Sequence, residues 1–135
     1  MKWELNKSRP ITQQIFEYIC ISISDDELKT NEKLPSVREL ALNLCVNPNT
    51  IQKSYELLEE RNVIYSVRGS GWYVNENVTT AKEVVEEIIE NKCNSFFDEM
   101  KQLGFDLKTT IKLLNERYGD DNEWIVKMCK FIKNI

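Results

Sequence analysis

The sequence lacks histidine, has few glycines and prolines, and contains no long apolar run, and each shortage argues against a class of protein. With no histidine among the 135 residues, a histidine general base is impossible. Four glycines and three prolines beside ordinary apolar content argue against a disordered chain. No apolar stretch approaches the roughly 20 residues of a membrane-spanning helix, and the start Met1-Lys2-Trp3-Glu4 has no signal-peptide core. We therefore expect a cytoplasmic protein that is not an enzyme and has no membrane partner.

The four cysteines are widely spaced and include no Cys-x-x-Cys pair, so neither a zinc site nor any other metal site is predicted. We interpret them as small buried apolar residues in a reducing compartment, with a disulfide as the alternative: Cys20, Cys45, Cys93 and Cys129. No pattern in the sequence indicates a cofactor, and none is predicted.

The overall charge does not indicate a nucleic-acid-binding protein. The net charge is −4, and residues 1–80 hold nine Lys and Arg against eleven Asp and Glu, as do residues 81–135. Binding to phosphate would need a local concentration of positive charge.

Two short helices with strong start signals lie in the first half of the chain. Ser36-Val37-Arg38-Glu39 reads as a capping box and predicts a helix over 36–44. Asn47-Pro48 starts the next helix, with asparagine as N-cap and proline in the first turn. Its expected core face is Ile51, Tyr55 and Leu58, with Leu57 as a further candidate. Two helices at this spacing are typical of a helix-turn-helix.

An amphipathic helix is predicted before this pair and a β-hairpin after it. Isoleucines at helical spacing predict the helix over 11–24, and a polar connection follows over 25–32. Residues 63–67 and 72–74 are β-branched and aromatic, and they flank Arg68-Gly69-Ser70-Gly71, whose glycines suit a tight turn. The hairpin could be purely structural, but its place after a helix-turn-helix favours a wing. Residues 1–77 are therefore predicted to form a winged helix-turn-helix domain.

Residues 78–135 are predicted to form a helical tail. A capping box at Thr80 starts a helix over about 81–103, which ends at Gly104. Asp106 starts a shorter helix that ends near Gly119. A last helix begins at Asp120 or Asp121 and carries Trp124, Ile125, Met128, Cys129 and Ile132. The predicted fold class is mainly α with a small β-hairpin wing.

The first tail helix carries an apolar stripe that a short tail cannot bury by itself. With Ile88 beside it, the stripe consists of Val85, Ile89, Phe96, Met100 and Leu103. We expect these five residues to form the interface of a symmetric homodimer. The alternative is that the tail packs on its own winged helix.

Three segments of the chain resemble the DNA-binding domain of the GntR family of bacterial transcription regulators: LPSVRELA, VNPNT and RGSGWYV. Together, PSVRELA, VNPNT and the G-x-G-x-x-V wing resemble the short YtrA-like branch of that family. Arg9-Pro10-Ile11 and the residues up to Ile15 are similar to the P-I-x-x-Q-I first helix of the family. A fainter similarity to the short helical tail of the branch continues through 81–117.

The resemblance implies a regulator that binds double-stranded DNA at a specific sequence, as a homodimer on an inverted repeat, and we interpret it as a repressor. Larger relatives carry a sensor or aminotransferase-like domain, for which this chain has no room. A small-molecule effector is therefore not evident.

Carried over position by position, the DNA contacts implied by the resemblance are Arg38, Asn47, Asn49, Thr50, Gln52, Arg68 and Gly69. Lys53 is added as a phosphate partner. Asn and Gln match the edge of adenine, Arg matches guanine or phosphate, and helix N-termini offer N–H groups to phosphates. The chain departs from several relatives at Pro48, where they have an arginine.

Each of these residues also has a simpler interpretation. Asn47 and Thr50 could serve only as helix caps, Arg38 could pair with Glu39 or Glu59, and Arg68 could be a solvated turn residue. A different function is also open, namely a winged-helix module for protein–protein assembly that binds no DNA. The polar start of the second helix argues against such a module, because protein-binding surfaces favour apolar anchors.

Overall fold

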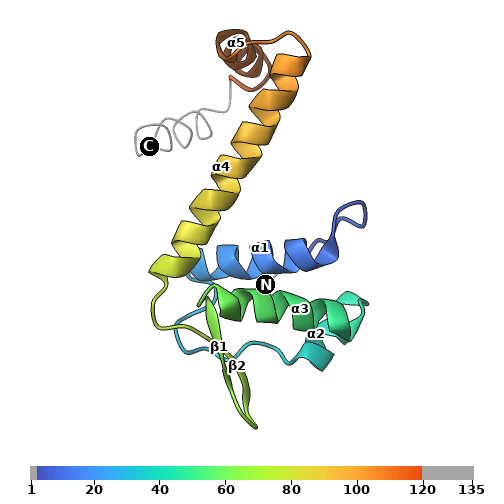
Figure 1. The fold of residues 1–135 in the computed structure, drawn as a ribbon, viewed down its shortest axis with the longest axis vertical. Helices are drawn as coiled ribbons and strands as arrows, with labels where there is room; N and C mark the ends of the chain where they lie inside the picture. The colour runs from blue at the N-terminus through green and yellow to red at the C-terminus, as the bar shows by residue number, and fades with distance from the viewer. Residues whose placement is uncertain (1–2, 120–135) are drawn as a thin grey trace. The chain divides into compact units, whose positions relative to one another are not determined.

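The computed structural model describes residues 3–119, which form helices and one hairpin (Figure 1) and divide into two compact units at residue 89. The predicted last helix, with Trp124 and the apolar residues after it, lies outside the described residues. The fold class is mainly α with a two-stranded antiparallel hairpin, as predicted. The elements are α1 (Ile11–Ser24), α2 (Val37–Leu44), α3 (Pro48–Glu60), β1 (Ile64–Val67), β2 (Gly71–Val74), α4 (Thr79–Gln102) and α5 (Leu107–Tyr118).

The first three helices begin at the residues that the sequence predicts. The Ser36 hydroxyl accepts from the Glu39 N–H, and the Glu39 carboxylate accepts from the Ser36 N–H, each at 3.1 Å. This is the predicted capping box of α2. Asn47 Oδ1 accepts from the Asn49 N–H at 2.9 Å, and Pro48 occupies the first turn of α3.

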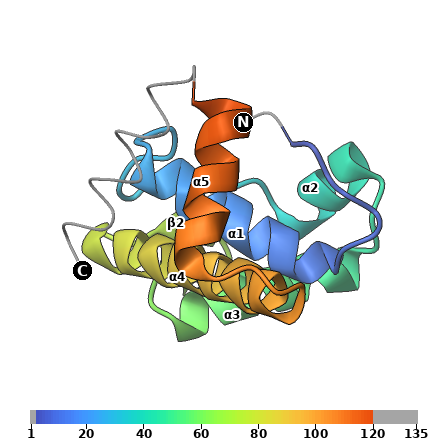
Figure 2. The same ribbon diagram turned by 90° about the horizontal axis from the view of Figure 1, so that it is seen from above.

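The core of the N-terminal unit lies between α1 and α3, which pack side by side (Figures 1 and 2). Ile15, Ile51 and Leu58 are fully buried there, and burial of such a side chain stabilises the fold by about 1.5–3 kcal/mol. Tyr55 is also fully buried, and its hydroxyl donates to the Pro35 carbonyl at 2.7 Å. Leu57, a further candidate for the core, is instead 39% exposed, because it lies off the row 51, 55, 58.

The segment before α1 is held by one buried side chain, Gln14. Its Oε1 accepts from the Asn6 N–H at 2.7 Å, and its Nε2 donates to the Asn6 carbonyl at 2.7 Å and to the Arg9 carbonyl at 3.1 Å. Trp3 stacks on Tyr18, with 4.7 Å between ring centroids. Residues 3–10 are therefore attached to the core.

The hairpin is completed by a third segment that the sequence pattern does not predict. Within the hairpin the paired residues are Ile64 with Val74, Tyr65 with Tyr73, Ser66 with Trp72, and Val67 with Gly71. On the other edge of β2, Lys33 forms a bridge with Tyr73. The Leu34 N–H donates to the Trp72 carbonyl at 2.8 Å, next to this bridge.

The start of α4 differs from the prediction. The helix begins at Thr79, where Asn77 Oδ1 accepts from the Thr79 N–H at 3.1 Å, so the predicted capping box at Thr80 is wrong. Ala81 and Val84 are buried in the core of the N-terminal unit. The expected domain boundary, after residue 77, falls just before this helix, whereas the compact unit extends to residue 89.

The apolar stripe of α4, expected to form the dimer interface, is partly covered by this core. Val85 and Ile88 pack partly against the N-terminal core, Ile89 and Phe96 are each 39% exposed, and Leu103 is 72% exposed. Met100 is half-buried.

The C-terminal unit follows the predicted helix ends. Gly104 has φ +87° after the end of α4, and Asp106 Oδ1 accepts from the Thr109 N–H at 2.7 Å to cap α5. Gly119 follows the last residue of α5, Tyr118. No helix within residues 3–119 is apolar over enough turns to cross a membrane.

Candidate nucleic-acid interface

The start of α3 presents most of the predicted DNA-contacting side chains. Asn47, Asn49 and Lys53 are exposed, while Thr50 and Gln52 are half-buried. Ile51 faces the core, so Asn49 and Lys53, two positions away on either side, lie on the opposite face of the helix, while Thr50 and Gln52 flank Ile51. Such short polar side chains at the start of a helix can reach base edges in a major groove.

The backbone at the start of α3 cannot donate to a phosphate, contrary to the expectation from the sequence. Pro48 has no N–H, the Asn49 N–H donates to the Asn47 side chain, and the Thr50 N–H donates to the Asn47 carbonyl at 3.0 Å. Asn47 is therefore occupied as an N-cap. Contacts from this helix must come from side chains.

Gln52 also has a partner within α3. Its Nε2 donates to the Glu56 carboxylate at 3.0 Å. Two donor–acceptor contacts to adenine would require this amide group to leave Glu56. The intrahelical hydrogen bond is exposed and therefore costs little to break.

The turn between α2 and α3 is built on Cys45, whose φ is +55° in the left-handed region. The Val46 N–H donates to the Ala41 carbonyl at 3.0 Å and closes the end of α2. Cys45 is exposed, so the prediction that all four cysteines are buried is wrong for this residue. The tight turn requires a left-handed residue at the surface, and cysteine occupies that position.

Arg38 is exposed on α2 and has no ion pair with any residue in the range 3–119. The Glu39 carboxylate accepts from the Ser36 N–H, and the Glu59 carboxylate accepts from the Ser66 N–H at 2.8 Å. The predicted alternative, an ion pair between Arg38 and one of these glutamates, is therefore wrong. The guanidinium group is available for phosphate or guanine.

The wing tip carries Arg68 and Gly69, both exposed. Gly69 has φ +78° and Gly71 has φ +139°, as a tight turn requires. Arg68 has no ion-pair partner in the described part of the chain. The ion pairs of arginine there belong to Arg9 with Glu17 at 3.4 Å and Arg61 with Glu87 at 2.8 Å.

Two contacts hold the wing at a fixed angle to α3. The Glu59 carboxylate, near the end of α3, binds the Ser66 N–H on the outer edge of β1. Trp72 on β2 meets the buried Tyr55 of α3 edge to face, with 5.5 Å between ring centroids. These two contacts attach the strands of the wing to α3.

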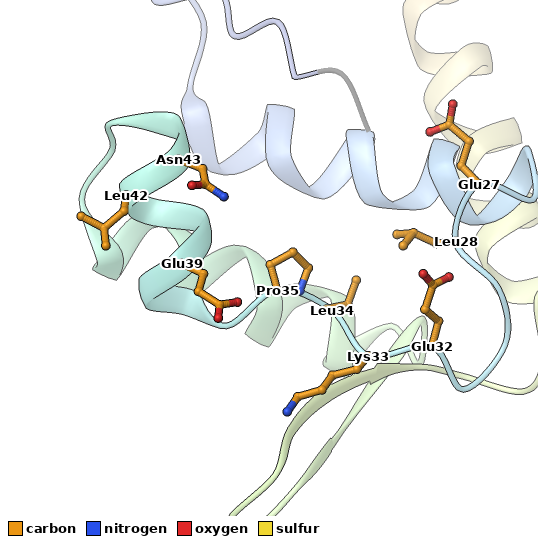
Figure 3. A pocket seen from close by; sticks show the side chains of 9 residues that line it. All are labelled: Glu27, Leu28, Glu32, Lys33, Leu34, Pro35, Glu39, Leu42 and Asn43. Atoms are coloured by element: carbon orange, nitrogen blue, oxygen red, sulfur yellow. The ribbon is translucent and has the colours of Figure 1, made fainter.

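An open groove of about 740 Å³ lies between α2 and the loop before it (Figure 3). Its lining carries three carboxylates, from Glu27, Glu32 and Glu39, and one cation, Lys33. The predicted DNA-contacting residues do not line it. In residues 3–119, no three side chains suited to metal binding gather.

The proteins that this chain resembles agree with the winged helix-turn-helix geometry. Residues 11–74 match the model of the bacterial regulatory proteins of the gntR family. The HTH-type transcriptional regulator YhcF of Bacillus subtilis is 35% identical over 101 residues, which cover 75% of this chain and 84% of YhcF. The chain belongs to the GntR family. It is therefore a transcriptional regulator with a winged helix-turn-helix DNA-binding domain, and not an enzyme.

Two further comparisons place it among short GntR regulators. The HTH-type transcriptional repressor YtrA of Bacillus subtilis is 37% identical over 99 residues, which cover 73% of this chain and 72% of YtrA. A GntR-family transcriptional regulator from Listeria monocytogenes has a similar structure, with a TM-score of 0.72 and 38% identity. This likeness covers 83% of this chain and 98% of the Listeria chain. The similarity of this GntR chain to YtrA-like regulators thus extends beyond the winged helix.

Proposed function

We propose that this GntR regulator represses transcription by binding an inverted-repeat operator as a homodimer. The observation that carries the proposal is the set of unpaired cations and polar side chains on α2, the start of α3 and the wing tip. In an acidic chain, these three elements expose Arg38, Asn49 and Arg68 to solvent, and neither arginine has an ion pair in the range 3–119. The name of YtrA as a repressor supports the direction of regulation.

The chemistry of each side chain determines whether it contacts phosphates or bases. Arg38 and Lys53 hold backbone phosphates, which gives affinity without sequence preference. Asn49 and Gln52 read base edges from α3 in the major groove, and Arg68 and Gly69 approach the DNA from the wing.

A homodimer compensates for the low positive charge. Once one half-site is bound, the second contact becomes intramolecular, which raises the overall affinity. The exposed apolar residues Ile89, Phe96 and Leu103 support a second copy of this chain as the partner. A two-fold dimer would place the α3 helices of the two copies about one DNA turn apart.

The DNA-binding test begins with selection of bound fragments from a random duplex pool by the full chain. Gln52→Ala should weaken binding to the selected operator by about 1–3 kcal/mol, with a smaller effect on random duplex. Gln13→Ala is the matched control, because Gln13 donates to Glu17 one turn away, as Gln52 does to Glu56. If no duplex is enriched, the proposal is wrong, and the alternative function as a winged-helix module for protein–protein assembly is favoured.

Arg38 is tested by the salt dependence of binding. Arg38→Ala should weaken operator and random duplex alike and lower the salt slope by about 0.9. Arg61→Ala is the control, because Arg61 is already paired with Glu87. Equal effects of the two substitutions would contradict the assignment of Arg38.

The dimer is tested by sedimentation of the full chain. We expect a dimer at micromolar concentration, and Phe96→Asp should give a monomer that binds the full operator poorly. Asn94→Asp adds the same charge to an exposed position of α4 without removing an apolar side chain, and should leave the dimer intact. A monomeric wild-type chain would refute the dimer.

A further inference from the structure

The segment that pairs with the outer edge of β2 places a lysine beside the wing. The Asn31 N–H donates to the Val74 carbonyl at 2.8 Å, the Val74 N–H to the Glu32 carbonyl at 2.9 Å, and the Leu34 N–H to the Trp72 carbonyl at 2.8 Å. Lys33 itself forms the bridge with β2. Its backbone is therefore fixed by hydrogen bonds to the strand.

The register sets the face on which Lys33 lies. Paired residues point to the same side of a sheet, and successive residues alternate. Ile64 and Val74 form the buried pair, whereas Tyr65 and Tyr73 stack on the opposite face, with 5.7 Å between ring centroids. Lys33, paired with Tyr73, shares that outer face.

Because Gly71 has no side chain, the Lys33 side chain can pack against the backbone at this position. A Cβ at Gly71 would lie 3.1 Å from Lys33 Cε and 3.9 Å from its Nζ. In Figure 3 the Lys33 side chain extends along the hairpin, on the side where α2 begins. Gly71 pairs with Val67, the residue before Arg68, so the ammonium group lies at the base of the wing tip.

The charge of Lys33 is not neutralised within the described part of the chain. Three carboxylates line the same groove, those of Glu27, Glu32 and Glu39. None of them forms an ion pair with Lys33. Glu32 instead accepts from the Lys29 N–H at 2.7 Å, and Glu39 accepts from the Ser36 N–H. A lysine acts as a point charge that a phosphate can approach from many directions.

We propose that Lys33 is a further DNA-contacting residue, which binds a backbone phosphate of the duplex beside the wing. The assignment rests on the operator binding proposed above. Lys33 would contribute to affinity on any sequence, because phosphates carry no base information.

The expected effect follows from counterion release. One phosphate contact contributes about 0.9 to the slope of log affinity against log salt, which corresponds to about fivefold in Kd at about 0.15 M salt. Lys33→Gln should therefore bind both operator and random duplex about fivefold more weakly, with a slope smaller by about 0.9.

The test measures fluorescence anisotropy of labelled operator and random duplex with the full chain, from about 0.05 to 0.3 M KCl. Lys33→Arg should keep the slope of the wild type. Lys29→Gln is the matched control, because Lys29 is exposed in the same loop and lies before the paired segment. Because Lys33 is exposed, the variants should keep the far-UV spectrum of the wild type.

The outcomes separate this inference from the proposed function. If the wild type binds no duplex, operator binding fails and the Lys33 assignment falls with it. If the wild type binds and Lys33→Gln matches it in affinity and slope, only the Lys33 assignment is wrong. Weaker binding to the operator alone would overturn the phosphate contact in favour of base reading, and an equal loss in Lys29→Gln would show a general charge effect.

Discussion

Removal of the Tyr55 hydroxyl should destabilise the winged helix although the ring remains. Tyr55 is fully buried, and its hydroxyl donates to the Pro35 carbonyl at 2.7 Å. Tyr55→Phe keeps the edge contact with Trp72 and nearly all of the buried apolar area. It removes one buried hydrogen bond and leaves the Pro35 carbonyl without this donor. This should lower the free energy of unfolding by about 1–2 kcal/mol.

Urea unfolding followed by circular dichroism measures the effect. With an m value of about 1.5 kcal/mol per molar, the midpoint should fall by about 1 M without a change in m. All proteins are compared as full chains at one concentration, because dimerisation would add to apparent stability. Since Pro35 directly precedes the capping box of α2, Tyr55→Phe should also weaken DNA binding through Arg38.

Tyr65→Phe is the matched control. The Tyr65 hydroxyl donates to Asn31 Oδ1 at 2.8 Å, but this hydrogen bond is exposed to solvent. Its loss should cost less than about 0.5 kcal/mol, because water replaces the partner. If Tyr55→Phe is no less stable than Tyr65→Phe, the buried hydrogen bond does not stabilise the start of α2.

Three further predictions concern thiols, the wing and α5. Burial raises the pKa of the Cys20 thiol to about 12, so mass-spectrometric mapping should find the exposed Cys45 alkylated before Cys20, which should react only after unfolding. Early labelling of Cys20 would contradict this. Gly71→Ala should weaken DNA binding more than Gly69→Ala. Both substitutions strain a positive φ by about 1–3 kcal/mol, but the added methyl group contacts the Lys33 side chain only at Gly71. Equal affinities of the two variants would contradict this. Hydrogen bonds from Thr109 lower the pKa of Asp106, so its capping is present above the usual carboxyl pKa and is lost as the pH falls through the lowered one. Asp106→Ala should therefore reduce the helical signal at about pH 7 but not at about pH 2, and an equal loss at both would exclude this mechanism.

The helices and the hairpin could be predicted because their signals are local. The capping box at Ser36, the N-cap at Asn47 and the turn at Gly69 each depend on residues within four positions. Where two local signals competed, the prediction failed: Asn77 starts α4, and Thr80 falls inside the helix.

The features that escaped prediction depend on contacts between distant segments. Lys33 shows no strand pattern of its own, and its pairing with β2 exists only once the hairpin has formed. The left-handed turn at Cys45 was hidden because glycine is the usual residue there. In the interface, the residue types that meet DNA could be carried over from the family resemblance. The partners that compete for them, such as Glu56 beside Gln52, required the structure.

The hydrogen bonds of Gln14 have a consequence for where this domain can be cut. The similarity to the gntR family model covers residues 11–74, yet the Gln14 amide finds its partners at Asn6, and Ala81 and Val84 close the core from the other side. A fragment trimmed to the matched residues would lose the segment that hydrogen-bonds the Gln14 amide, and it would expose to water the apolar surface that Ala81 and Val84 cover. The smallest piece with native stability is therefore expected to be longer at both ends than the residues that the family model matches. A DNA-binding domain transferred to another protein should therefore comprise residues 3–89.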